Sequence, residues 1–174
     1  MFEIKTPLIE EIVCQLKAGQ WVEVTGTVYV ARDQAHKRMA EALKSGQELP
    51  FDIKGQIIFY ASPAPAKPGR VIGPIGPTTS ARMDEFTPVL LEHGLKGAIG
   101  KGPRSENVKQ AFKKNRAIYL VTFGGAAALL SKHIKSAKII AYEDLGPESI
   151  LELNVEHFPA IIAIDCQGNT IFKK

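Results

Sequence analysis

The chain has 174 residues, of which 45% are apolar and 23% are charged, and this composition excludes a disordered, collagen-like or coiled-coil protein. Its net charge of +4 comes without a basic run interleaved with aromatic residues, so it favours a small anionic ligand over nucleic acid. No apolar run reaches the roughly 18 residues of a membrane-spanning helix, and residues 1–5 lack the features of a signal peptide, so we expect a cytoplasmic protein with no membrane partner.

The chain contains two cysteines, Cys14 and Cys166, which are far apart in sequence. Neither has a second cysteine or a histidine at metal-ligand spacing. Because two thiols alone cannot hold a zinc ion or an iron-sulfur cluster, we expect buried, reduced thiols and no metal or cofactor site in this chain.

The first half of the chain alternates between helical and strand patterns. Apolar residues three and four positions apart predict a helix over 8–16, and β-branched and aromatic residues predict a strand over 20–30. Helical spacing returns over 33–43, and an apolar run predicts a strand over 56–61. Residues 62–77 are so rich in proline and glycine that we expect a shaped loop beside a site.

The second half alternates more regularly. Helices are predicted over 79–93, 105–115 and 125–133, the first of them kinked or broken at Pro88. Strands are predicted over 97–99, 117–122, 138–142, 150–153, 160–165 and 170–172. Together these elements predict one α/β domain over 1–174, with a mostly parallel, buried central sheet and antiparallel strands at its ends.

Three polar clusters follow predicted strands, at 32–36, 76–84 and 100–102. Sheets of α/β proteins bind ligands at the ends of their strands, so these clusters are the candidate site. Arg32, Arg82 and Lys101 would concentrate positive charge there, and two arginine forks suit the two carboxylates of a dicarboxylate. If a helix begins at Thr78 or Thr79, the Thr78 hydroxyl lies near the Arg82 guanidinium on its first turn.

Other interpretations of these clusters are also open. A phosphate-binding loop over residues 94–102 is excluded, because Leu95 stands where that motif needs glycine and Gly102 where it needs serine or threonine. Each cluster taken singly could be a helix start, a cap or a surface lysine. His36 could point into a pocket, or it could be a half-buried histidine bonded to a carbonyl.

The three motifs carry a resemblance to a known family. Ala31-Arg32-Asp33-x-Ala35-His36-Lys37, Gly76-Pro77-Thr78-Thr79-x-x-Arg82-Met83-Asp84 and Gly100-Lys101-Gly102 resemble the β subunit of class I fumarases and L-tartrate dehydratases. The resemblance covers nearly the whole chain. It implies a swivelling β/β/α sandwich and a hydro-lyase that reversibly hydrates fumarate to L-malate.

The resemblance also implies roles for individual residues. Arg32 and Arg82 resemble the arginines that hold the substrate carboxylates, and Lys101 resembles a further anion contact. Thr78 matches the hydroxyl that moves the proton, and His36 is the second catalytic candidate. The remaining candidates for substrate binding are Asp33, Thr79 and Gly102.

Finally, the resemblance implies a partner. In that family a four-iron four-sulfur cluster is held by three cysteines of an α part, whereas this chain has two cysteines. We therefore expect an iron-sulfur α subunit, assembled as a dimer of αβ pairs, and a small dicarboxylate substrate. The alternatives are an L-tartrate dehydratase β subunit and a non-catalytic dicarboxylate-binding assembly subunit.

Overall fold

The computed structural model describes residues 1–173, and a seven-stranded sheet forms their centre. The strands are β1 Phe2–Lys5, β2 Trp21–Val30, β3 Ile57–Phe59, β4 Gly97–Gly100, β5 Ile118–Val121, β6 Ile134–Ala141 and β7 Ile150–Ile164. Neighbouring strands from β1 to β5 pair in parallel, whereas β7 pairs antiparallel with β2, β5 and β6. The mixed α/β class with parallel and antiparallel strands is therefore confirmed.

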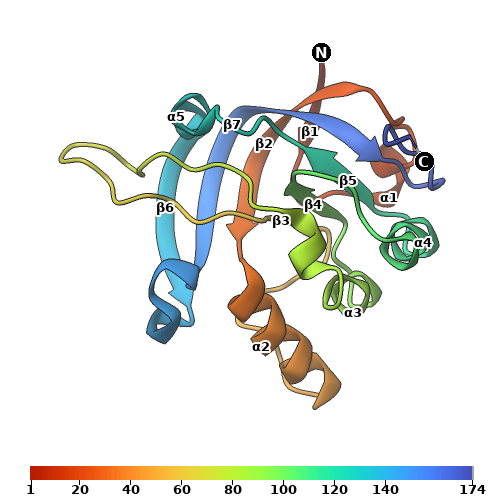
Figure 1. Cartoon of the computed structure of the whole chain (residues 1–174), viewed down its shortest axis with the longest axis horizontal. Coiled ribbons are helices and arrows are strands. Elements are labelled where there is room, and N and C mark those ends of the chain that lie inside the picture. The colour runs from red at the N-terminus through yellow and green to blue at the C-terminus, as the bar shows by residue number, and fades with distance from the viewer. Residues whose placement is uncertain (174) are drawn as a thin grey trace.

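The sheet closes on itself instead of lying flat in layers. Strand β7 joins both β2 and β5, so β2, β3, β4, β5 and β7 form a ring to which β1 and β6 are added (Figure 1). This barrel-like closure differs from the expected sandwich. It depends on the 15-residue length of β7, where the sequence pattern predicted two separate strands over 150–153 and 160–165.

A bulge explains why β7 was divided in the prediction. The β2–β7 register shifts between Val24 and Gly26, so that Glu156 and His157 of β7 oppose one residue of β2. His157 has a φ of 52° there. Polar residues at the bulge break the apolar run, but the strand continues through it and bends more strongly, as a closed sheet requires.

Apart from α2, the helices are shorter than the patterns predicted. They are α1 Glu10–Val13, α2 Asp33–Lys44, α3 Thr87–Glu92, α4 Glu106–Lys114 and α5 Ala127–Leu130, with 3₁₀ turns η1 Ser80–Met83, η2 Ser131–His133 and η3 Glu143–Glu148. The helix predicted over 79–93 is divided into η1 and α3, because Pro88 lies in the first turn of α3, where its missing N–H costs nothing. None of these helices in residues 1–173 is long and apolar enough to cross a membrane.

Both faces of the central strands β3, β4 and β5 are buried, as their near-continuous apolar residues predicted. Side chains alternate between faces along a strand, so Leu120 of β5 joins the core that contains Phe158 inside the ring, and Tyr119 joins a second core beneath α2, α3 and α4. This second core lies directly under the ends of β3 and β4. It therefore supports the segments that carry the candidate site residues.

Residues 62–76 form an arm that projects from the sheet (Figure 1). The base of the arm is held by a hydrogen bond from the Ala64 N–H to the Pro74 carbonyl oxygen, 2.9 Å long, and by a bridge between Ala61 and Pro77. The chain leaves β3 into this arm and returns directly beside β3. The proline-rich segment thereby brings Thr78 back to the end of the strand that it left.

Candidate functional site

Backbone hydrogen bonds bring the three polar clusters to one edge of the sheet. The Ala31 N–H donates to the Phe59 carbonyl oxygen (3.2 Å), and the Thr78 N–H donates to the Tyr60 carbonyl oxygen (2.7 Å). The Ser80 N–H donates to the carbonyl oxygen of Lys101 (3.1 Å). Because β2, β3 and β4 run parallel, their carboxyl ends share this edge, and the juxtaposition that the sequence predicted is present.

Arg32 stands at the start of α2 with an incompletely paired guanidinium. Its Nε lies 3.9 Å from both Asp33 Oδ1 and Glu148 Oε1, too far for a hydrogen bond. Arg32 Nε and Asp33 Oδ1 are both buried and without a hydrogen-bond partner. Buried polar atoms are normally paired, so these two atoms indicate a place where a polar ligand would complete the bonding. Glu148 was missed by the sequence analysis, since it comes from η3, far along the chain.

His36 lies one turn further along α2 and is fully buried. Its Nδ1 is 2.9 Å from the Arg32 carbonyl oxygen, and a carbonyl only accepts, so Nδ1 carries the proton. Burial lowers the pKa of His36 to about 4; the Arg32 hydrogen bond opposes this shift, and the nearby Arg104 charge adds to it. The ring is therefore neutral near pH 7, with the lone pair of Nε2 buried and unpaired.

Thr78, Thr79 and Lys101 lie beside one another, but not on a helix. Thr79 and Lys101 form a parallel bridge, and Thr78 is half-buried while Thr79 and Lys101 are exposed. The 3₁₀ turn η1 begins only at Ser80. The expected spacing of Thr78 and Arg82 on one helical turn is therefore wrong, because the backbone at Thr78 is tied to β3 instead.

Arg82 and Gly102 complete the set of candidates. Arg82 is exposed in η1, and it brings a second guanidinium to the segment that follows Thr78. Gly102 has a φ of 81°, a left-handed conformation that favours glycine and turns the chain directly after Lys101. Five of the candidates therefore come from segments hydrogen-bonded to each other, and three from the start of α2.

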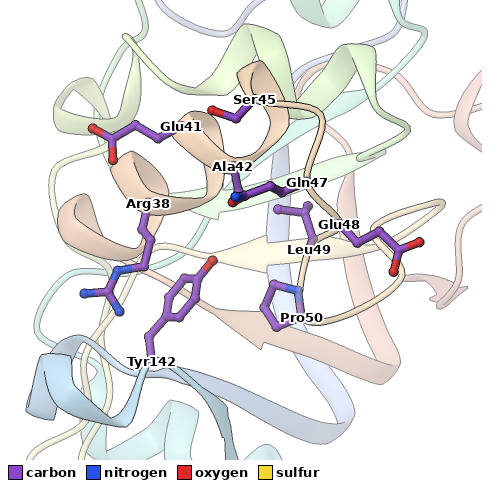
Figure 2. Close-up of a pocket in the computed structure, with 9 residues that line it drawn as sticks. All are labelled: Arg38, Glu41, Ala42, Ser45, Gln47, Glu48, Leu49, Pro50 and Tyr142. Carbon is purple, nitrogen blue, oxygen red and sulfur yellow. The ribbon is translucent and has the colours of Figure 1, made fainter.

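The hollow shown in Figure 2 is a different place on the molecule. It has a volume of about 410 Å³ and contains none of the candidate residues. Its arginine, Arg38, already forms a two-pronged ion pair with Asp144 at 2.8 and 2.7 Å and lies 4.7 Å above the Tyr142 ring. A cation that is already neutralised is a poor anion receptor, so we do not assign the ligand site to this hollow.

Residues 1–173 offer no ligand set for a metal centre. No group of three or more His, Cys, Asp or Glu side chains converges within this range, and Cys14 and Cys166 are both free thiols. A four-iron four-sulfur cluster with three thiolates does not fit these residues. We therefore derive no step of the chemistry through such a group.

The mixed sheet brings arginine, threonine and lysine to the ends of three parallel strands, which defines an α/β protein with a positively charged edge. The model of the family described as Fumarase C-terminus matches residues 1–174, and the chain belongs to this family. This result confirms the resemblance that the three motifs carry.

Individual relatives agree with this assignment. The chain is 40% identical over 171 residues to the anaerobic class I fumarate hydratase of Escherichia coli, covering 95% of this chain and 31% of that protein. It is 38% identical to fumarate hydratase 2 of Leishmania major, again covering 31% of that protein. A putative L(+)-tartrate dehydratase subunit beta of Methanocaldococcus jannaschii is 37% identical, with 96% of this chain and 89% of that protein covered. The chain thus spans about a third of the fumarate hydratases that it matches.

Proposed function

We propose that this chain is the β subunit of a hydro-lyase that interconverts fumarate and L-malate. The observation that carries the proposal is the gathering of Arg32, Thr78 and Lys101 at one edge of the sheet, beside buried polar atoms that lack partners. Membership in the fumarase family supports a dicarboxylate as the substrate class of this edge.

Binding of the dicarboxylate is the first task of these residues. Each carboxylate would be held by one guanidinium, Arg32 at one end and Arg82 at the other, since a planar fork makes two parallel hydrogen bonds to a carboxylate. Lys101 would add a third positive charge. Thr79 and the N–H of Gly102 would donate further hydrogen bonds to the bound acid, and Asp33 would accept one from the hydroxyl of L-malate.

Stabilisation of developing charge is the second task. Removing the proton from the carbon next to a carboxylate spreads negative charge into that carboxylate, and fixed cations at its oxygens lower the energy of this state. We assign the proton transfer to Thr78, whose half-buried side chain would accept the carbon-bound proton as an alkoxide. Lys101 pairs with the neighbouring Thr79, and its positive charge would stabilise that alkoxide.

His36 is the less favoured proton carrier. Its Nδ1 is committed to the Arg32 carbonyl and its ring is neutral near pH 7. The arrangement suits a residue that fixes the carbonyl, and hence the backbone, of Arg32. We propose that His36 contributes mainly by orienting Arg32, with Nε2 available to accept one hydrogen bond.

A partner subunit belongs to the same proposal. The chain covers 31% of two fumarate hydratases but 89% of a relative named as a subunit beta. We infer that a separate α subunit supplies the remaining portion and carries the four-iron four-sulfur cluster. The edge with Arg32, Thr78 and Lys101 would face it, and the swivelling implied by the resemblance would bring the two together.

Variants of Thr78 test the proposed chemistry. In the αβ complex, Thr78→Val keeps the shape of the side chain but removes the hydroxyl, and should lower kcat on the order of a hundredfold to ten-thousandfold. Thr78→Ser keeps the hydroxyl and should retain most of the turnover. Equal turnover of Thr78→Val and wild type would remove Thr78 from the mechanism.

Tartrate is the second candidate substrate. It is favoured by the high coverage of the tartrate dehydratase relative, whose length this chain nearly matches. Parallel assays of the same complex with fumarate, L-malate and tartrate decide between them through kcat/KM.

A further inference from the structure

A buried arginine that the proposed chemistry does not use lies beneath the Lys101 segment. The Arg104 side chain has no exposed surface, and its Nε lies 2.6 Å from Asp84 Oδ1. Its two other nitrogens donate to the Tyr60 hydroxyl (3.3 Å) and to Thr87 Oγ1 (2.8 Å). Each of the three guanidinium nitrogens thus donates to a partner within the protein.

Aromatic rings enclose the same guanidinium. Its central carbon lies 4.9 Å from the Tyr119 ring centre, 5.2 Å from that of Tyr60 and 5.7 Å from that of Phe112. Burial alone would lower the pKa of Arg104, but Tyr60 and Asp84 raise it above its ordinary value. Arg104 therefore stays positively charged in the core. A buried charge destabilises the fold unless it is paired with an opposite charge and its hydrogen bonds are satisfied.

The groups around Arg104 also hold the two segments that carry candidate site residues. Asp84, directly after η1, accepts from Arg104 Nε and, through its other oxygen, from the Ser105 N–H (2.8 Å). The Tyr119 hydroxyl lies 2.8 Å from both Ser80 Oγ and the Gly102 carbonyl oxygen. Ser80 Oγ accepts in turn from the Lys101 N–H (3.0 Å).

These contacts join residues 78–84 to residues 100–105. Thr79 and Ser80 contact Lys101, and Asp84 contacts Arg104 and the Ser105 N–H. Tyr119 bridges Ser80 and Gly102 from β5. Of these contacts, the one between Asp84 and Arg104 pairs opposite charges.

We propose that Arg104 is a positioning residue, which fixes the spacing between the Lys101 segment and the segment carrying Thr78 and Arg82. The expected effect of Arg104 on catalysis rests on the proposed function. The fixed spacing of the two segments rests only on the contacts described above. Lysine cannot replace arginine here, because an ammonium group lacks the planar fork that reaches Asp84, Tyr60 and Thr87 at once.

The test compares two arginine-to-lysine variants in the complete αβ complex. Arg104→Lys keeps the charge but removes the fork. Arg38→Lys is the matched control, since Arg38 also forms a two-pronged ion pair and lies over a tyrosine ring, but away from the site. Tyr119→Phe is a milder second variant, which keeps the ring and removes only the hydroxyl contacts to Ser80 and Gly102.

Two readouts separate positioning from plain stability. Amide hydrogen exchange should become faster at Ser80 and Lys101 in Arg104→Lys, whereas exchange in β2 should stay at the wild-type rate. At a temperature where every variant is folded, KM for the dicarboxylate should rise, or kcat fall, on the order of tenfold to a hundredfold, because small displacements of binding groups are that costly. Tyr119→Phe should change both readouts in the same direction, and Arg38→Lys neither.

Either of two results would overturn the inference. One is unchanged exchange at Ser80 and Lys101 in both Arg104→Lys and Tyr119→Phe. The other is faster exchange with wild-type KM and kcat, which would make Arg104 a purely structural residue. A wild-type complex that converts neither acid would instead overturn the proposed function, and the exchange rates would then decide the positioning role.

Discussion

The protonation state of His36 follows from its surroundings more than from its residue type. The Arg32-Asp-x-Ala-His36 motif placed the ring on the helix that bears Arg32, and α2 begins at Asp33 as that pattern predicted. The sequence could not show that the ring would be fully buried, because burial depends on Tyr60 packing edge-on against it at 5.2 Å. The ring is bonded to a carbonyl, as one of the two open interpretations predicted, but it is fully buried instead of half-buried.

This burial makes folding stability depend on pH. The folded-state pKa of about 4 lies below the ordinary value of 6.5, so the unfolded chain binds more protons between these values. The contribution of neutral His36 is complete above about pH 6.5 and decreases as the pH falls toward 4, by roughly 3 kcal/mol in all. Urea unfolding at several pH values should show this loss in the wild type, and His36→Asn should lack that part of it. Parallel pH profiles for the two proteins would contradict the assignment.

Arg104 shows a limit of sequence analysis at the same scale. It lies two residues beyond Gly102, in a polar stretch that is typical of a surface turn. Nothing in the spacing indicates that Asp84, Tyr60 and Thr87 converge on it. Its burial follows from the packing of η1 and α3 against β3, which only the tertiary structure shows.

At the scale of elements, the sequence patterns predicted correctly those segments whose own residues determine their secondary structure. The helices predicted over 33–43 and 105–115 agree with α2 and α4 within a residue or two at each end. In α4, the Ser105 hydroxyl accepts from the Val108 N–H (3.3 Å), as expected for a helix cap. The predictions were wrong where pairing with a distant segment determines the secondary structure. Strand β1 was missed because its four residues are defined by pairing with β2, and β7 was divided at its bulge.

The close packing of β4 against η1 gives a prediction at this scale. A Cβ added at Gly100 would collide with Ser80 Oγ and lie 2.9 Å from Tyr60 Cδ2, whereas a Cβ at Gly124 would meet nothing within 4 Å. We expect Gly100→Ala to destabilise the fold by about 1–3 kcal/mol and Gly124→Ala to stay within about 0.5 kcal/mol of wild type. Urea unfolding midpoints measure both. Equal unfolding midpoints for Gly100→Ala and Gly124→Ala would contradict this expectation, because they would mean that the segment around Ser80 moves aside at little cost in stability.

At the scale of the whole molecule, closure of the sheet determines what the site can be. The mixed α/β class and the gathering of the three clusters at strand ends were predictable, since parallel strands place their carboxyl ends together. The ring formed by β7 was not, because it depends on pairing between residues more than 100 positions apart. The structure therefore has an exposed, cationic edge with Arg82 and Lys101 in solvent, and an enclosed dicarboxylate site requires something to cover that edge.

We propose that this edge becomes a hydro-lyase site only when a partner covers it. The most direct measurement co-expresses the chain with a candidate α subunit bearing three cysteines, assembles the cluster without oxygen, and follows fumarate loss and L-malate formation by absorbance. We expect turnover by the complex, none by either subunit alone, and a loss of activity on the order of a hundredfold or more in Arg82→Ala. A cluster-loaded complex that converts neither fumarate nor tartrate, or one that Arg82→Ala leaves unchanged, would contradict it.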